Sequence, residues 1–189
     1  MTTIAAILGS VTPPGRLSSA VGGALARIEA GGNSATLLDL GQFTLGFADG
    51  RPLEQLTDDT PRLVNTVQAA EAVVLATPVY RATLTGALKN ALDLLPIEAL
   101  QGKPVAVIAM GATLHHYLGA ESHLRDILAW FGAIQLPASV YLSSADFAEG
   151  KLTAAADATL DELMATLVAF AGVAGSVSKG PAPLAAAHR

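Results

Sequence analysis

The 189-residue sequence predicts an α/β fold, in which helices cover both faces of a five-stranded parallel sheet. Three observations lead to this prediction: short apolar runs bounded by turn residues, amphipathic patterns between these runs, and a length typical of one domain. Strands that alternate with helices imply right-handed crossovers, and five strands favour the order 2-1-3-4-5. In that order the loops after the first and third strands face one crevice.

The apolar runs predict the five strands in turn. They cover Ile4–Leu8, Ala35–Leu40, Ala72–Ala76, Val105–Met110 and Ser139–Leu142. Most of these runs are apolar nearly throughout, as is typical of parallel strands buried on both faces.

Apolar residues three or four positions apart predict five helices between and after the strands. The apolar positions of the five are Val21, Ala24, Leu25 and Ile28; Leu63, Val64 and Val67; Leu84, Ala87, Leu88, Ala91, Leu92 and Leu95; Leu124, Ile127, Leu128 and Phe131; and Leu160, Leu163, Leu167 and Phe170. We expect one domain over residues 1–174. Residues 175–189 offer little to pack, and we expect a disordered tail there.

Composition and charge narrow the function. With 11 basic and 16 acidic residues the formal net charge is −5, so we expect neither nucleic acid nor an anionic membrane surface as a partner. The absence of cysteine excludes thiol catalysis, disulfide exchange and iron–sulfur ligation. Mean hydropathy is +0.47, yet no apolar run approaches the roughly 18 residues of a membrane span. The first residues lack a basic segment, and we expect a cytoplasmic enzyme.

The loop after the first predicted strand, residues 9–19, has the composition of a phosphate site. We predict that a helix begins near Ser18, so that unpaired helix N–H groups would meet an anion here. The side chains that suit a phosphate monoester are Ser10, Arg16, Ser18 and Ser19. The alternative is a serine-capped helix after a proline turn. The loop is neither G-x-G-x-x-G nor a P-loop, which disfavours Rossmann-type dinucleotide binding and nucleotide triphosphate hydrolysis.

The stretch from Thr77 to Asp93 joins the third strand to the next helix. Pro78 predicts a turn directly after the strand, which leaves the following residues to present backbone groups and an aromatic face to the crevice. These residues are Val79, Tyr80 and Arg81. A flat, partly polar ring would fit there. The alternative is that Tyr80 caps the sheet edge.

A third loop follows the fourth strand. Its residues Gly111, Ala112 and Thr113 can direct main-chain N–H groups at the far edge of the same ring. His115 and His116 are acid/base candidates, but they have no acidic neighbour at metal-ligand spacing and we expect no metal site. Ser10 also lacks the G-x-S-x-G elbow of hydrolases. Hydride transfer between a nicotinamide and a flavin fits better, because the cofactors carry that chemistry themselves and no catalytic side chain is needed.

At these residues the chain resembles the NAD(P)H-dependent FMN reductases of the flavodoxin-like superfamily, most closely those of two-component alkanesulfonate or methanesulfonate monooxygenase systems. The segments that carry this resemblance most strongly are Thr77–Tyr80, Thr85–Lys89, Leu92–Pro96 and Ala99–Lys103. The resemblance implies three groups of FMN contacts. They are Ser10, Arg16, Ser18 and Ser19 at the phosphate; Pro78, Val79, Tyr80 and Arg81 at the isoalloxazine; and Gly111, Ala112 and Thr113 at its pyrimidine side.

The sequence departs from the family pattern in all three loops. Val11-Thr12 stands where the family often has Pro-Arg, which leaves Arg16 as the main charge at the phosphate. Arg81 replaces a frequent lysine. Ala112 replaces a glycine, and main-chain donation is preserved there if Ala112 needs no positive φ.

The resemblance also implies how the protein is used. NADPH or NADH would reduce FMN, and reduced flavin would pass to a partner flavin-dependent monooxygenase. The alternatives are a tightly FMN-bound quinone, azo-dye or chromate reductase, and a flavodoxin-like electron carrier. In such reductases the fourth helix helps to build a tetramer, and here it carries a second stripe formed by His123, Ile127 and Trp130. We therefore expect a homotetramer or homodimer, unless the chain's own last helix covers Trp130.

Overall fold

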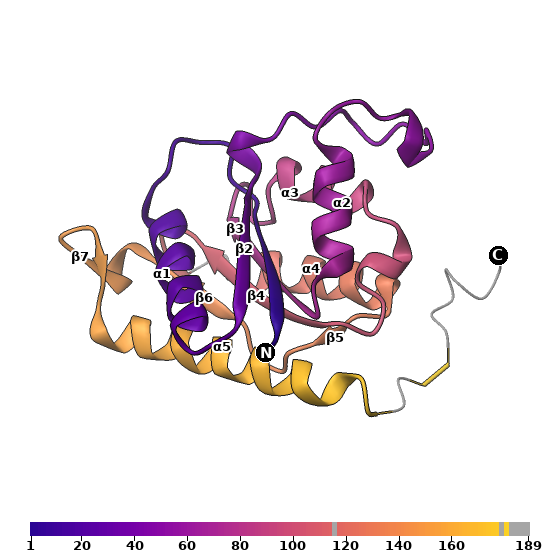
Figure 1. Ribbon diagram of the computed structural model, residues 1–189. Helices are drawn as coiled ribbons and strands as arrows, with labels where there is room; N and C mark the ends of the chain where they lie inside the picture. The colour runs from indigo at the N-terminus through magenta and orange to yellow at the C-terminus, as the bar shows by residue number, and fades with distance from the viewer. Residues whose placement is uncertain (115–116, 178–179, 182–189) are drawn as a thin grey trace.

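A parallel sheet lies at the centre of the computed structural model, which describes residues 1–114, 117–177 and 180–181 (Figure 1). The strand order is β2-β1-β3-β4-β5, with β6 also paired to β4. This is the flavodoxin-like order, and it confirms the predicted fold class. The strands are β1 (Thr3–Leu8), β2 (Ser34–Asp39), β3 (Ala72–Pro78), β4 (Pro104–Met110), β5 (Ile134–Gln135) and β6 (Val140–Leu142).

Two short strands share the fifth position of the sheet, where one strand over Ser139–Leu142 was expected. β5 pairs with the start of β4 through Ile134 and Pro104, and β6 pairs with its end through Val140 and Ile108. Pro137 lies between the two segments and has no N–H to donate, which accounts for the interruption. The prediction therefore missed β5.

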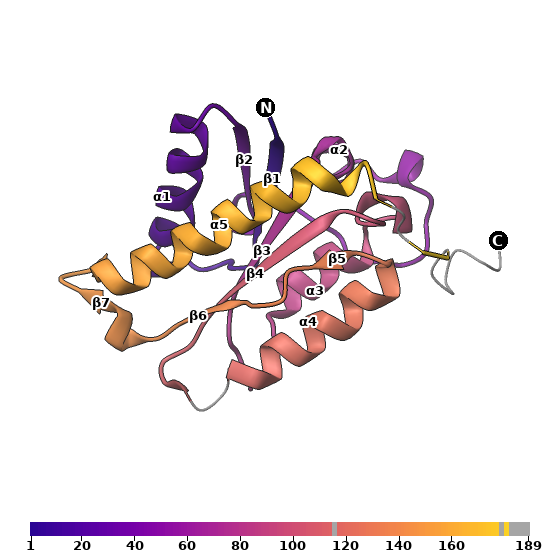
Figure 2. The ribbon, with the colours of Figure 1, turned by 90° about the horizontal axis from the view of Figure 1, so that it is seen from below.

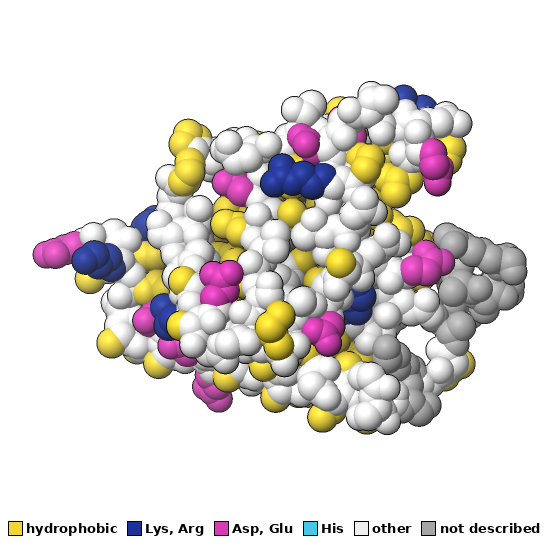
Figure 3. Space-filling model, in the orientation of Figure 1, with side chains coloured by type: hydrophobic (Ala, Val, Ile, Leu, Met, Phe, Trp, Pro, Cys, Tyr) yellow, Lys and Arg dark blue, Asp and Glu magenta, His cyan; other side chains and the backbone are white. Residues whose placement is uncertain are grey.

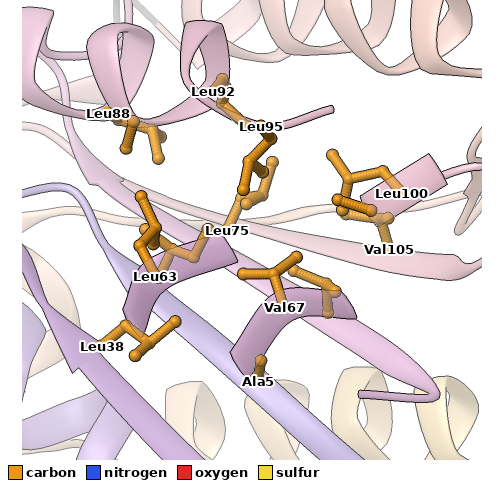
Figure 4. Packing of buried hydrophobic residues seen from close by; sticks show 14 of the residues in the cluster. Ala5, Leu38, Leu63, Val67, Leu75, Leu88, Leu92, Leu95, Leu100 and Val105 are labelled. Atoms are coloured by element: carbon orange, nitrogen blue, oxygen red, sulfur yellow. The ribbon is translucent and has the colours of Figure 1, made fainter. Parts of the chain in front are cut away.

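Helices cover the two faces of the sheet separately (Figure 2). On one face lie α1 (Arg16–Ala30) and α5 (Ala154–Ala174), and on the other lie α2 (Thr60–Ala69), α3 (Gly86–Asp93) and α4 (Tyr117–Phe131). Successive strand residues alternate between the two cores, as Ile7 and Leu8 of β1 do. Figure 4 shows the core under α2 and α3, where Leu63, Leu75 and Leu88 lie.

The first helix begins earlier than the sequence indicates. α1 starts at Arg16 rather than near Ser18, and its N-cap is Gly15, without a side-chain cap hydrogen bond. The alternative of a serine-capped helix is therefore wrong.

At the other end of the chain, α5 runs to Ala174. The expected tail over 175–189 stays a prediction, because residues 178–179 and 182–189 lie outside the described residues. Among the helices in the described part of the chain, none is long and apolar enough to cross a membrane.

A small hairpin precedes α5 and was not predicted. β7 (Phe147–Ala148) pairs with β8 (Lys151–Leu152) in antiparallel fashion. The connecting residues Glu149 and Gly150 have φ values of 51° and 79°, and positive φ at both central residues is typical of a type I′ turn.

Acidic and basic side chains are scattered over the face seen in Figure 3 rather than gathered in one patch.

Candidate functional site

A cavity of about 150 Å³ lies where the first and third strands end. It brings together five of the predicted site residues, namely Ser10, Arg16, Ser18, Pro78 and Tyr80. The other lining residues are Leu8, Thr12, Pro13, Pro14, Gly15, Leu17, Asp39 and Met110. The two loops that the topology directs at one crevice therefore share a cavity there.

Thr85 joins the two loops directly. Its hydroxyl donates to the carbonyl oxygen of Gly9 at 2.5 Å and accepts from the N–H of Leu88 at 3.1 Å, as the N-cap of α3. Its own N–H donates to the hydroxyl of Thr77 at 3.2 Å. Thr85 and Thr77 are both buried, so water does not compete for these hydrogen bonds. This one hydroxyl sets the loop after β1 against the loop after β3.

The side of the cavity where the sequence predicts a phosphate consists of the α1 N-terminus and hydroxyl groups. The first turn of α1 has N–H groups that no acceptor inside the helix can reach, and Gly15 supplies no side chain to cap them. Ser10 and Thr12 are hydrogen-bonded to each other through their hydroxyls at 2.9 Å. Asp39 accepts the N–H of Gly41 at 3.0 Å.

Ser19 does not join the other predicted phosphate residues. It lines a different cavity, between α1 and the β7–β8 hairpin, with Arg27 and Phe147. Its N–H donates to Gly15 within the helix.

The loop after β3 uses some of its donors internally. Pro78 is the last residue of the strand, and the turn follows two residues later than expected. The N–H of Val79 donates to Met110 at 2.7 Å, and that of Tyr80 donates to Thr83 at 3.0 Å. Tyr80 lines the cavity and is 48% exposed, so its ring is open on one side.

The turn at Tyr80–Thr83 is strained. Arg81 and Ala82 have φ values of 53° and 63°, which is costly for residues with a Cβ, at about 1 kcal/mol or more each. Helix α4 supports the turn at two points one helical turn apart. The hydroxyl of Thr83 is hydrogen-bonded to Nδ1 of His123 at 2.6 Å, and the carbonyl of Ala82 lies against Gly119. A side chain at position 119 would overlap that carbonyl.

We expect Gly119→Ala to lower turnover at this site by about tenfold or more, because a displacement of about 1 Å from a reactive geometry costs about that much or more. Helix propensity alone predicts that this substitution stabilises the protein, with a free energy of unfolding higher by about 1 kcal/mol. The matched control is Gly172→Ala on α5, where an added Cβ meets nothing within 4 Å. Turnover and thermal unfolding of both variants check this, and equal turnover of the two would contradict it.

The loop after β4 has fewer free donors than its sequence suggests. The N–H of Gly111 donates to Leu142 at 3.0 Å, so it is not available to a ligand. Ala112 has no positive φ, so alanine is tolerated there. Position 111 needs glycine because a Cβ would overlap the hydroxyl of Tyr141, which donates to the carbonyl of Thr113 at 2.7 Å. Partial burial raises the pKa of the Tyr141 phenol above its ordinary 10.0, so it remains a donor at neutral pH.

Sequence reasoning missed the residues that hold these loops. Thr85 carried the signal of a helix N-cap, but Gly119 and Tyr141 carried none, since both act through contacts distant in sequence. His115 and His116 lie outside the described residues.

The predicted exposed stripe on α4 includes Trp130, which is 55% exposed. The alternative that the last helix covers Trp130 is wrong, because α5 packs on the opposite face of the sheet.

Comparison with known proteins yields a family and several relatives. The family model for NADPH-dependent FMN reductase matches residues 2–147. An NAD(P)H-dependent FAD/FMN reductase of Geobacillus thermodenitrificans is 38% identical over 60% of this chain and 61% of its own length. An NADPH azoreductase of Bacillus sp. is 30% identical over 76% of this chain and 80% of its own. The matched region therefore spans about three fifths of the first of these relatives.

A solved structure supports the fold. The apo form of an NADH:FMN oxidoreductase (EMOB) superposes with a TM-score of 0.77, at 24% identity, over 96% of this chain and 92% of that one. At this identity the likeness concerns the fold alone. The family match covers most of the chain and agrees with the sheet order and the loops described above. The chain therefore belongs to the NADPH-dependent FMN reductase family.

Proposed function

We propose that this protein is an NAD(P)H-dependent FMN reductase. The observation that carries the proposal is the cavity that Arg16, Ser10 and Ser18 line together with Pro78 and Tyr80. A phosphate needs charge and donors at one end of a site, and a flavin ring needs a flat face at the other.

The residues present fit bound FMN. The uncapped N-terminus of α1 supplies main-chain donors and the positive end of a helix dipole, and Arg16 adds a guanidinium. The cavity suits the phosphate end, and the half-exposed ring of Tyr80 leaves the isoalloxazine an open edge where a nicotinamide could approach. We extend the ring contacts to Val79, Arg81, Ala112 and Thr113 as further proposals. The phosphate contact predicted for Ser19 is left out of the proposal, because Ser19 lines the other cavity with Arg27 and Phe147.

When bound, FMN would supply the redox chemistry by accepting a hydride from NAD(P)H. The residues of this chain would bind the flavin and align it for that transfer. Arg16 and the α1 N-terminus anchor the phosphate. The strained turn at Arg81 and Ala82, which α4 supports through Thr83, fixes the backbone next to Tyr80. No side chain is asked to move a proton.

The direct test mixes the purified protein with FMN and either NADPH or NADH under anaerobic conditions. We expect the absorbance of the reduced nicotinamide and of oxidised flavin to fall together, mole for mole. The preferred nicotinamide is the one that is oxidised faster. If neither nicotinamide is oxidised in a flavin-dependent way, the proposal is wrong.

The second candidate is a reductase of quinones, azo dyes or chromate with tightly bound FMN. The similarity to an NADPH azoreductase over 80% of that protein's length supports this second candidate. Gel filtration separates the two: a protein that stays yellow holds FMN as a cofactor, and a colourless one uses it as a dissociable substrate. A flavodoxin-like electron carrier is disfavoured by the modest charge of −5.

The partners follow from the proposed reaction. Dissociable reduced FMN would serve a flavin-dependent monooxygenase, as the resemblance to sulfonate-system reductases suggests. We propose that the protein works in the cytoplasm as a homotetramer or homodimer. The exposed Trp130 on α4 supports association through that helix.

A further inference from the structure

Two arginines of α1 contact the C-terminal third of the chain in different ways. Arg27 forms ion pairs with two aspartates of α5, at 2.8 and 2.6 Å. Arg16 donates through Nη2 to the hydroxyl of Ser144 at 3.3 Å, and its Cζ lies 5.1 Å from the ring centroid of Phe147. Arg27 is thus neutralised by carboxylates, whereas Arg16 is held by a hydroxyl and a ring.

The charge of Arg16 remains available to a ligand. Across 1–114, 117–177 and 180–181 no carboxylate forms an ion pair with it, and neither of its two contacts carries a negative charge. At the same time Arg16 lines the cavity beside Ser10 and Ser18. An arginine that is oriented without being neutralised keeps its attraction for a phosphate.

The segment that holds Arg16 is itself well braced. The side chain of Asp146 accepts from the N–H and the hydroxyl of Ser143 at 2.7 and 2.9 Å, which closes a capping box. Directly after it, Phe147 pairs with Leu152 in the β7–β8 hairpin. The N–H of Thr153 then donates back to Asp146 at 2.9 Å. Ser144 and Phe147 therefore stand on a closed, hydrogen-bonded loop.

We propose that Phe147 and Ser144 are positioning residues that hold Arg16 toward the 5′-phosphate of FMN, an inference that rests on the proposed function. A free arginine loses rotamer freedom when it binds a phosphate, and one that is already held loses less. Phe147 thereby raises the affinity for a phosphorylated flavin without touching the flavin. Its contribution is absent for riboflavin, which lacks the phosphate.

The test measures dissociation constants for FMN and for riboflavin by quenching of flavin fluorescence, with full-length protein. We expect Phe147→Leu to weaken FMN binding about two- to fivefold, the range of an exposed cation–π contact, and to leave riboflavin binding unchanged. Phe147→Tyr keeps the ring and should restore FMN affinity. Phe170→Leu, at a half-buried position on α5, is the matched control and should leave both constants unchanged.

A double-mutant cycle assigns the effect to Arg16. With Arg16→Ala in place, Phe147→Leu should weaken FMN no further, because the residue it positions is gone. Equal weakening of FMN and riboflavin by Phe147→Leu would overturn the positioning role while leaving the proposed reductase intact. Wild-type protein that bound FMN no better than riboflavin would overturn the phosphate site as well, and the absence of flavin-dependent nicotinamide oxidation would overturn the proposed function.

Discussion

Thr85→Val should lower the free energy of unfolding by about 2–4 kcal/mol, although valine has nearly the same shape as threonine. Two losses contribute: α3 loses its N-cap, and the carbonyl of Gly9 loses its hydrogen bond in a buried place. For a domain of this size the midpoint of thermal unfolding should fall by about 5–15 °C. Thermal or chemical denaturation measures the change.

A second threonine provides the control for this prediction. Thr159 on α5 is exposed, and its hydroxyl donates only to Ala155 in its own helix. Thr159→Val should therefore change the free energy of unfolding by no more than about 0.5 kcal/mol. The same loss in both variants would show that Thr85 does not join the two loops energetically.

Arg16→Ala should raise the dissociation constant for FMN by about 10- to 150-fold, because a hydrogen bond to a charged group contributes about 1.5–3 kcal/mol. Riboflavin binding should not change. Arg16 is exposed on the first turn of α1, so the variant should fold with near-normal stability. Fluorescence titration with each flavin measures the ratio, which should also fall as salt is added to the wild-type protein.

Arg27 offers the matched control on the same helix. Its guanidinium is occupied by two aspartates, and it lies at the other end of α1. Arg27→Ala should leave the preference for FMN over riboflavin unchanged. If the two arginine variants lost this preference alike, net charge rather than the position of Arg16 would be responsible.

The sheet could be predicted from the sequence because most of its strands are continuous apolar runs. Ala72–Ala76 and Val105–Met110 are buried along nearly their whole length, so burial and sequence pattern agree. The crevice then follows from the strand order alone. β5 could not be predicted in this way, since two residues beside a proline show no periodicity.

The sequence predicts which segments form the candidate site, but not which residues in them contact one another. Ser10, Arg16 and Tyr80 lie together because parallel strands end at one edge. Thr85 meets Gly9 across 76 positions, and Arg16 meets Ser144 across 128. No local sequence pattern indicates contacts between residues that lie so far apart in the sequence. The turn at Arg81 and Ala82 was also hidden, because left-handed turns of this type normally carry Asn or Gly.

The broken edge strand of the sheet has a bearing on how copies of this chain can meet. A long open edge exposes a row of N–H and C=O groups to which a strand of another molecule can add, and this is a common route to aggregation. Here β5 and β6 have two and three residues, with Pro137 between them. An incoming strand finds no continuous partner along this edge. This edge is thereby closed to strand addition, whereas β2 at the other edge has six continuous residues and, among the described strands, pairs only with β1. Any pairing of two sheets would therefore run through β2.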